Sequence, residues 1–137
     1  MRHLTDTHAH TVASTHAYST VEEYFRAASD KGLQLFSITD HGPEMPDSPH
    51  PWHFGNMRVL PRIRYGVAML RGIEANILPA DHHPLDVNHT LMSFMDFGIA
   101  SFHEPVFPPS DRETHTRAMI GTAQCQRSAK RRFDSCY

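Results

Sequence analysis

Two histidines separated by one residue, His8 and His10, lie near the N-terminus and are the feature that most constrains how this chain folds. In an extended strand successive side chains alternate between faces, so Asp6, His8 and His10 are expected to point the same way. Two imidazoles at this spacing near a strand end can hold a small cation between them. His16 follows after a short polar loop that can bring it back to the same place. A lone histidine is more often a surface or hydrogen-bonded core residue, an interpretation we keep for His3, whereas the grouped histidines predict a metal site.

The composition disfavours several other classes of protein. The 137 residues suffice for one domain, and a formal net charge of −2 with neutral histidines gives the whole chain no electrostatic attraction to nucleic acid or membranes. Twelve histidines are spread along the chain, as expected for ligands gathered by folding rather than for a histidine-rich tract. The two cysteines, Cys125 and Cys136, lie near the C-terminus, so neither a disulfide framework nor a cysteine-type zinc site is predicted. Because it has no signal-like apolar segment and no stretch of about 18 apolar residues, the sequence predicts a cytoplasmic protein with no membrane partner.

A strand, a helix and a second strand are predicted within the first 41 residues. Thr20 with Glu23, or the pair one residue earlier, forms a capping box that opens a helix over residues 21–31, and Gly32 is placed to end it. Residues 33–41 are mostly apolar, which is typical of a parallel strand buried on both faces. This order predicts a right-handed βαβ unit, in which functional residues gather at the carboxyl ends of the strands.

Two further apolar segments, residues 65–76 and 95–105, are predicted strands that also end in ligand-type residues. The four strand ends carry His10, His41, Glu74 and His103. One polar strand end is ordinary, whereas four with this chemistry predict a convergent site at the mouth of a parallel α/β fold. Residues 110–121 begin with a capping sequence and predict a short helix.

The two long connections offer further candidates. Residues 42–62 contain five prolines, so we expect no regular structure there, and a loop of this length is usually functional or disordered. Its Trp52 is interpreted either as a wall of a substrate site or as packing onto the fold, and its Arg58 either as a phosphate-binding group or as a solvated charge. Residues 77–93 are also expected to be weakly structured, with the pair His82-His83 in solvent.

The character of the sequence changes at Ala123. Residues 123–137 have no helical or strand period and carry four basic residues against one acidic residue. We therefore expect a disordered tail outside a domain formed by residues 1–122. A basic tail can contact nucleic acid, but this one has no recognised binding fold, so nucleic acid is not a predicted partner.

Four motifs, taken in order, resemble one family. They are His8-Ala-His10-Thr-Val-Ala-Ser-Thr-His16, Ile38-Thr-Asp-His41-Gly, Arg71-Gly-Ile-Glu74-Ala-Asn and Phe102-His103-Glu-Pro. The chain resembles the PHP (polymerase and histidinol phosphatase) metal-dependent phosphoesterases, most closely the YcdX-type trinuclear-zinc bacterial phosphatases, from the N-terminus to about Thr122. The resemblance implies an α/β fold that is the N-terminal portion of a distorted (βα)7 TIM-like barrel, with about four parallel strands present and the barrel incomplete.

The resemblance also implies a site of three zinc ions at the barrel mouth, with manganese or another divalent metal as the alternative. The implied ligands are His8, His10 and Glu74 for the first ion, Glu74 and His103 for the second, and His16 and His41 for the third. Asp40 is expected to orient neighbouring ligands without touching a metal, or else to be an ordinary hydrogen-bonding residue at a strand end. The implied nucleophile is a zinc-bound hydroxide, and the ions clamp the phosphate oxygens, so no serine or cysteine nucleophile is needed.

The predicted function is therefore that of a phosphatase, a metal-dependent hydrolase of phosphate monoesters whose partner is a small phosphorylated substrate. Family members are longer and supply further ligands, and barrels of this kind usually need about 200 residues or more, so we expect a truncated chain. The alternative is a catalytically inactive remnant that binds metal weakly or not at all. A related PHP reaction, such as exonuclease or histidinol-phosphate cleavage, is disfavoured by the loop after His41. An unclosed barrel can also be completed by self-association.

Overall fold

The computed structural model describes residues 4–79 and 83–129. Its elements in chain order are β1 (Thr5–Asp6), η1 (Val12–Ser14), α1 (Val21–Lys31), β2 (Leu35–Ile38), α2 (Pro51–Asn56), η2 (Met57–Val59), β3 (Ile63–Arg64), β4 (Val67–Asn76), α3 (His89–Met92), β5 (Phe97–Ser101) and α4 (Arg112–Ala129). None of the helices in these two ranges combines the length and the apolar character needed to cross a membrane.

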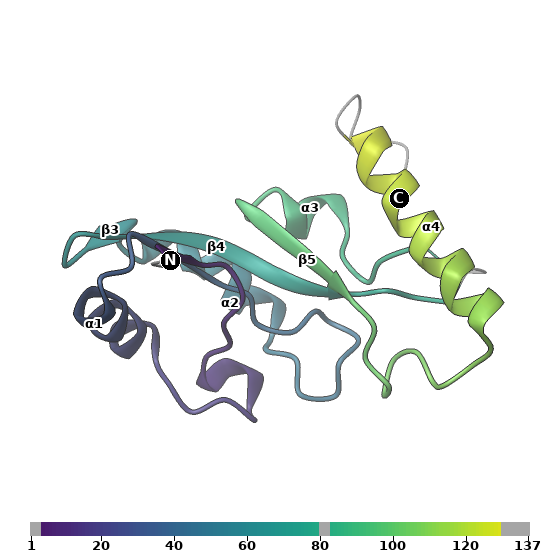
Figure 1. The fold of residues 1–137 in the computed structure, drawn as a ribbon, viewed down its shortest axis with the longest axis horizontal. Helices are drawn as coiled ribbons and strands as arrows, with labels where there is room; N and C mark the ends of the chain where they lie inside the picture. The colour runs from purple at the N-terminus through teal and green to yellow at the C-terminus, as the bar shows by residue number, and fades with distance from the viewer. Residues whose placement is uncertain (1–3, 80–82, 130–137) are drawn as a thin grey trace.

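Four parallel strands form an open half-barrel (Figure 1). β2 pairs with β1 on one side and with β4 on the other, so that Leu35 lies opposite both Thr5 and Ala68. β5 pairs with the second half of β4, where Gly72 lies opposite Phe97. Within the described ranges β1 pairs only with β2 and β5 only with β4, which leaves both edges of the half-barrel open. The predicted α/β architecture, with about four parallel strands and an incomplete barrel, is confirmed.

Helix α1 forms as the sequence predicts. The Thr20 hydroxyl accepts a hydrogen bond from the Glu23 backbone N–H, and the Glu23 carboxylate accepts one from the Thr20 N–H at 2.7 Å, which completes the capping box. Gly32 ends the helix with a φ of 69°, a conformation that favours glycine. The buried face of α1 packs on β2, where the Phe25 and Phe36 rings pack edge to face with their centroids 4.9 Å apart.

All four strands of the half-barrel are shorter than predicted. β2 covers Leu35–Ile38 and β5 covers Phe97–Ser101, so His41 and His103 lie beyond the strands that were predicted to carry them. β1 covers only Thr5–Asp6, so His8 and His10 lie in the loop that follows it and not within the strand. β4 begins at Val67, because Tyr65 and Gly66 form the turn of a hairpin with β3. Both turn residues have positive φ, 51° and 77°, as the tight turns favoured in hairpins require.

The two long connections contain helices where we expected no regular structure. In residues 42–62, the His50 side chain caps α2, Pro51 occupies its first turn, and the buried Phe54 ties the helix to the sheet. In residues 77–93, the Asn88 side chain caps α3 by accepting a hydrogen bond from the Leu91 N–H at 2.9 Å. The expectation that these segments lack helices is therefore wrong, because local caps and apolar anchors outweigh the effect of the prolines.

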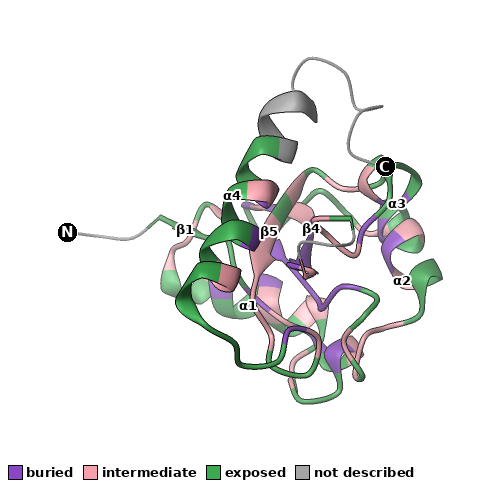
Figure 2. Cartoon of the chain, turned by 90° about the vertical axis from the view of Figure 1, so that its right-hand side faces the viewer, coloured by how far each residue is buried: buried purple, intermediate pink, exposed green. Residues whose placement is uncertain are grey.

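Helix α4 is longer than predicted. Asp111 caps its start by accepting a hydrogen bond from the Thr114 N–H at 2.8 Å, as the capping sequence indicated. The helix then continues to Ala129, so residues 123–129 are helical where we expected no regular structure, and residues 130–137 lie outside the described ranges. Most of the residues of α4 up to Gln124 are exposed (Figure 2), and this part of the helix contacts the rest of the chain through a small cluster around Phe107 and Ala118.

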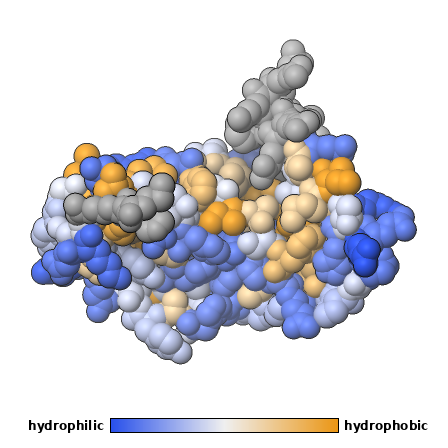
Figure 3. Space-filling model, in the orientation of Figure 1, coloured by the Kyte–Doolittle hydropathy of each residue, from blue (hydrophilic) through white to orange (hydrophobic). Residues whose placement is uncertain are grey.

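The core follows the sheet in three clusters. The first lies between α1 and β2, the second between α2, α3 and β4, and the third under α4. Apolar side chains also reach the surface at the end of the molecule that carries α4 (Figure 3), where Met119 and Ile120 are exposed. The main core therefore supports the strands whose ends carry the ligand-type residues, whereas α4 is a peripheral element.

Candidate metal centre

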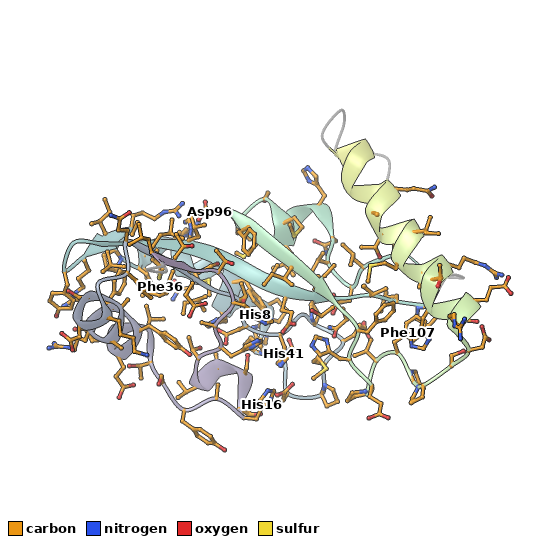
Figure 4. The ribbon with its side chains drawn as sticks, in the orientation of Figure 1. His8, His16, Phe36, His41, Asp96 and Phe107 are labelled. Atoms are coloured by element: carbon orange, nitrogen blue, oxygen red, sulfur yellow. The ribbon has the colours of Figure 1, made fainter. Side chains whose placement is uncertain are left out.

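The structure brings together the six side chains predicted as metal ligands. They come from the loops that follow β1, η1, β2 and β5 and from β4 itself, and they are His8, His10, His16, His41, Glu74 and His103. Figure 4 labels three of them, His8, His16 and His41. Their clustering follows from the parallel sheet, because the carboxyl ends of neighbouring parallel strands lie at the same edge. Asp6 does not join the cluster; its carboxylate accepts a hydrogen bond from the His8 backbone N–H at 3.2 Å.

Glu74 lies at the centre of this cluster. Its Oε2 is 3.0 Å from His10 Nε2 and 3.4 Å from His41 Nδ1. Its Oε1 is 3.3 Å from His8 Nε2 and 3.4 Å from His103 Nε2. The carboxylate is 5% exposed, so four imidazoles surround one nearly buried anion.

The electrostatics keep Glu74 ionised. Burial tends to raise the pKa of this carboxyl, but hydrogen bonds from His10 and Ser101 and the proximity of His8 and His103 outweigh it, so the pKa lies well below its ordinary value. An ionised carboxylate is the form that binds a cation.

The histidines direct ring nitrogens toward one another and toward Glu74. Burial lowers the pKa of His41, with the His10 ring acting in the same direction, so the ring is held neutral. Its Nδ1 is buried and forms no hydrogen bond. The Nε2 atoms of His8 and His10 face each other at 3.1 Å, and those of His16 and His41 at 3.3 Å. Each such pair can share one N–H, so at least one of the two nitrogens carries a lone pair, the form in which imidazole binds a cation.

Among the described residues, three sets of side chains place their ligand atoms within 4.8 Å of one another. They are His8, His10 and Glu74; His41, Glu74 and His103; and His16, His41 and Asp47. The first set contains the residues that the resemblance implied for one ion. The second adds His41 to the implied pair of Glu74 and His103, and the third adds Asp47 to the implied pair of His16 and His41. The donor set, neutral imidazoles with carboxylates, suits zinc and other divalent ions of the first transition series.

Asp47 was missed in the sequence analysis. It lies in the proline-rich loop after β2, and its Oδ2 contacts His16 Nδ1 while its buried Oδ1 has no hydrogen-bond partner. A loop aspartate six residues after His41 carries no periodic signal, so spacing cannot identify it. Asn76, which contacts His103, was also missed, although it shares a strand face with Glu74 two residues earlier.

Asp40 organises the loop that carries the first ligands. Its buried carboxylate accepts hydrogen bonds from the Thr11 N–H at 2.7 Å, the Thr11 and Ser14 hydroxyls, each at 2.8 Å, and the His53 ring at 2.9 Å. Burial tends to raise the pKa of Asp40, but the hydrogen bonds, led by that from His53, outweigh it and the pKa is lowered. Ser14 in turn lies 3.4 Å from His10 Nδ1 and accepts a hydrogen bond from the His41 N–H, so Asp40 is linked to two candidate ligands through one hydroxyl.

Arg58 and Trp52 lie at a separate cavity of about 980 Å³ between α2 and α3. None of the six predicted ligands lines this cavity. Trp52 is 81% exposed, so the interpretation that it packs onto the fold is wrong, whereas its role as a substrate wall stays a prediction. His83 is exposed, as expected, and His82 lies outside the described residues.

Comparison with known proteins identifies the family. The PHP domain profile matches residues 6–126. A probable phosphatase of Shewanella sediminis (strain HAW-EB3) is 59% identical over 124 residues, which are 90% of this chain and 50% of the relative. A probable phosphatase of Enterobacter sp. (strain 638) is 58% identical over 117 residues, 85% of this chain and 47% of the relative. The chain thus spans about half the length of the curated relatives it matches, and it belongs to the PHP domain family.

Proposed function

We propose that this chain carries the metal-binding part of a phosphatase that hydrolyses phosphate monoesters with divalent cations, zinc first among them. The observation that carries the proposal is the placement of one nearly buried, ionised carboxylate, Glu74, within 3.4 Å of ring nitrogens from four histidines. A nearly buried negative charge surrounded by imidazole nitrogens is the environment that a divalent cation needs from its ligands. The names of the relatives, probable phosphatases, agree with this chemistry.

Each set of ligand-type side chains would hold one ion. Glu74 serves two of the sets, with His8 and His10 on one side and with His41 and His103 on the other, and Asp47 completes the set formed with His16 and His41. When bound, divalent cations at such a site lower the pKa of a coordinated water and offset the negative charge that develops on phosphate oxygens. Manganese or another divalent metal is the alternative to zinc.

The chain's own residues would then position the ions and the substrate. Asp40 fixes the loop that carries His10 through the Thr11 and Ser14 hydroxyls. Arg58, exposed at the cavity between α2 and α3, is the proposed phosphate-binding group, and Trp52 the proposed wall beside it. The expected partner is a small phosphorylated substrate.

A second candidate is a metal-binding unit that does not turn over by itself. It is favoured by the open half-barrel and by the small number of ligands, three at most in each set among the described residues, where a closed zinc site takes four. A second copy of the chain can cover the open sheet, so we also propose self-association as a partner interaction.

Metal content and turnover, measured on the same monodisperse sample, test the two candidates. We would strip the protein with a chelator, restore zinc or manganese, count bound ions by elemental analysis and assay p-nitrophenyl phosphate hydrolysis. Turnover that is lost with the metal and restored by it supports the phosphatase. Bound metal without turnover supports the second candidate, and no bound metal refutes both. Sedimentation of the same sample reports self-association.

A further inference from the structure

A fully buried amide determines which nitrogen of His103 carries its proton. Asn76, at the end of β4, is 0% exposed, and its Oδ1 lies 2.7 Å from His103 Nδ1. A carbonyl oxygen accepts but does not donate, so the contact requires a proton on Nδ1. The lone pair of a neutral His103 then lies on Nε2, the nitrogen that faces Glu74 Oε1 at 3.4 Å.

The orientation of the Asn76 amide is itself fixed by Asp86. The Asn76 Nδ2 donates to Asp86 Oδ2, and the Asn76 backbone N–H donates to Asp86 Oδ1 at 2.7 Å. Burial raises the pKa of Asp86, yet both of its carboxylate oxygens accept from N–H groups. The carboxylate therefore selects the nitrogen end of the amide and leaves the oxygen end to His103. If the amide were flipped, its oxygen would face the Asp86 carboxylate oxygen with no proton between the two acceptors.

Asp86 is held in place from two sides. Its Oδ2 also accepts a hydrogen bond from the Glu44 N–H at 3.0 Å, in the loop that follows His41. It packs directly over Gly42, where an added Cβ would lie 2.7 Å from Oδ2, so this position requires glycine for the close approach. The Asp86 N–H donates to the Asn76 carbonyl at 3.2 Å, which aligns this segment with the end of β4.

We propose that Asp86 and Asn76 are positioning residues that set the tautomer of His103 for metal binding. The chain of contacts runs from the Asp86 carboxylate through the Asn76 amide to His103 Nδ1, and it presents Nε2 as the ligand atom. Asp86 lies ten residues after Asn76, in the connection between β4 and α3, and touches none of the proposed ligands. The proposal rests on the proposed function in one respect, the binding of a divalent ion by Glu74 and His103.

Partners that orient a ligating histidine typically contribute about 10–100-fold to metal affinity. We therefore expect D86N, whose amide cannot accept from all three N–H donors, to weaken zinc binding at the Glu74–His103 site by about that factor. N76L, which has the same branching at Cγ but no acceptor, should do the same. In the double variant N76D/D86N the carboxylate is moved to position 76, where it accepts from His103 Nδ1 and from the new amide, so most of the affinity should return.

Two measurements test the proposal on the full chain. Long-range ¹H–¹⁵N spectra of the metal-free protein report the His103 tautomer, and chelator competition with zinc alone reports affinity. We expect the Nδ1–H form in the wild type, a shift toward the Nε2–H form in D86N and N76L, and the Nδ1–H form again in N76D/D86N. D30N makes the same aspartate-to-asparagine change at an exposed position on α1, so it is the matched control and should leave both readouts unchanged.

The tautomer readout separates this proposal from the proposed function. A wild type that binds no zinc contradicts the metal site, yet the metal-free spectra still decide what Asp86 and Asn76 do. If D86N and N76L lower thermal stability but keep the wild-type tautomer, the two residues are structural and the proposal is overturned. Should either variant fail to fold, G42A keeps every polar group and displaces Asp86 sterically; an unchanged tautomer there also overturns it.

Discussion

Replacing Glu74 by glutamine is the sharpest test of the metal centre. The change keeps the size of the side chain and one oxygen, but removes the charge that lies within 3.4 Å of a ring nitrogen of four histidines. Glu74 contributes to two of the three ligand sets, and it is the carboxylate in both. E74Q therefore leaves two imidazoles in each of those sets, while the set of His16, His41 and Asp47 keeps all its members.

The expected loss can be bounded from this geometry. Removing an outer partner of a metal ligand costs about 10–100-fold in affinity, and a direct, charged ligand contributes at least as much. Each of the two affected ions should therefore be bound more weakly by at least about 1.4–2.8 kcal/mol. The ion of the third set should be bound as in the wild type.

Zinc titration of the chelator-stripped protein, with elemental analysis after desalting, measures both the number of ions and their affinities. D47N is the complementary variant, because Asp47 belongs only to the set with His16 and His41 and its loss should affect one ion. H83A changes an exposed histidine outside the cluster and serves as the matched control. Equal zinc content in E74Q and H83A would refute the central role of Glu74, and a loss of the same ions in E74Q and D47N would refute the division into sets.

Two further variants test how the surroundings are held. D40N places an amide among four hydrogen-bond donors and leaves at least one of them without an acceptor. It should therefore destabilise the metal-free protein by about 3 kcal/mol, measured by urea unfolding. A loss of stability below about 0.5 kcal/mol, the range expected for D30N, would contradict the anchoring of Ser14 by Asp40. Asp96 forms a bidentate ion pair with Arg62, which lowers the pKa of Asp96 to about 2, below the ordinary value of 3.8. The ion pair therefore contributes fully to stability above pH 4, and this contribution is lost as the pH falls toward 2. D96N should be about 1 kcal/mol less stable than the wild type at pH 6 and nearly as stable near pH 2. A stability difference that does not depend on pH would exclude this ion pair as its origin.

The parts of the fold that depend on local signals were predictable. The capping box of Thr20 and Glu23, the left-handed Gly32 and the apolar segment around Phe36 each act within a few residues, and α1 and β2 form where they indicate. The helices α2 and α3 were missed because prolines dominate their segments, while the contacts that stabilise them, such as Phe54 packed with Leu91, join residues far apart in the sequence. The extent of α4 was underestimated because nothing after Gly121 marks an amphipathic period.

The location of the candidate site was predictable for a similar reason. Parallel strands bring their carboxyl ends to one edge, so a ligand-type residue near each of four strand ends was sufficient to expect convergence. The strand bounds were less predictable, because β1, β2 and β5 end before the histidines predicted for them and only Glu74 lies within its strand. Residues in loops that reach the site from outside the sheet are not placed by the order of the strands. Asp47 reaches His16 from a proline-rich loop, and neither its spacing nor its neighbours distinguish it from a solvated aspartate.

The orientation of the ligands is set by residues from other segments of the chain. Ser14 lies beside His10 but is held by Asp40 at the end of β2, and Asn76 contacts His103 but is oriented by Asp86 beyond β4. Each of these links joins two segments of the chain at the mouth of the half-barrel. A substitution in one segment therefore affects a ligand carried by the other. Metal affinity should therefore respond to changes at residues that touch no ligand, and such changes should be non-additive along each link and additive between the Asp40 and Asp86 links. A double-mutant cycle on zinc affinity distinguishes this arrangement from one in which each ligand is held only by its own strand, because independent strands would give additive losses throughout.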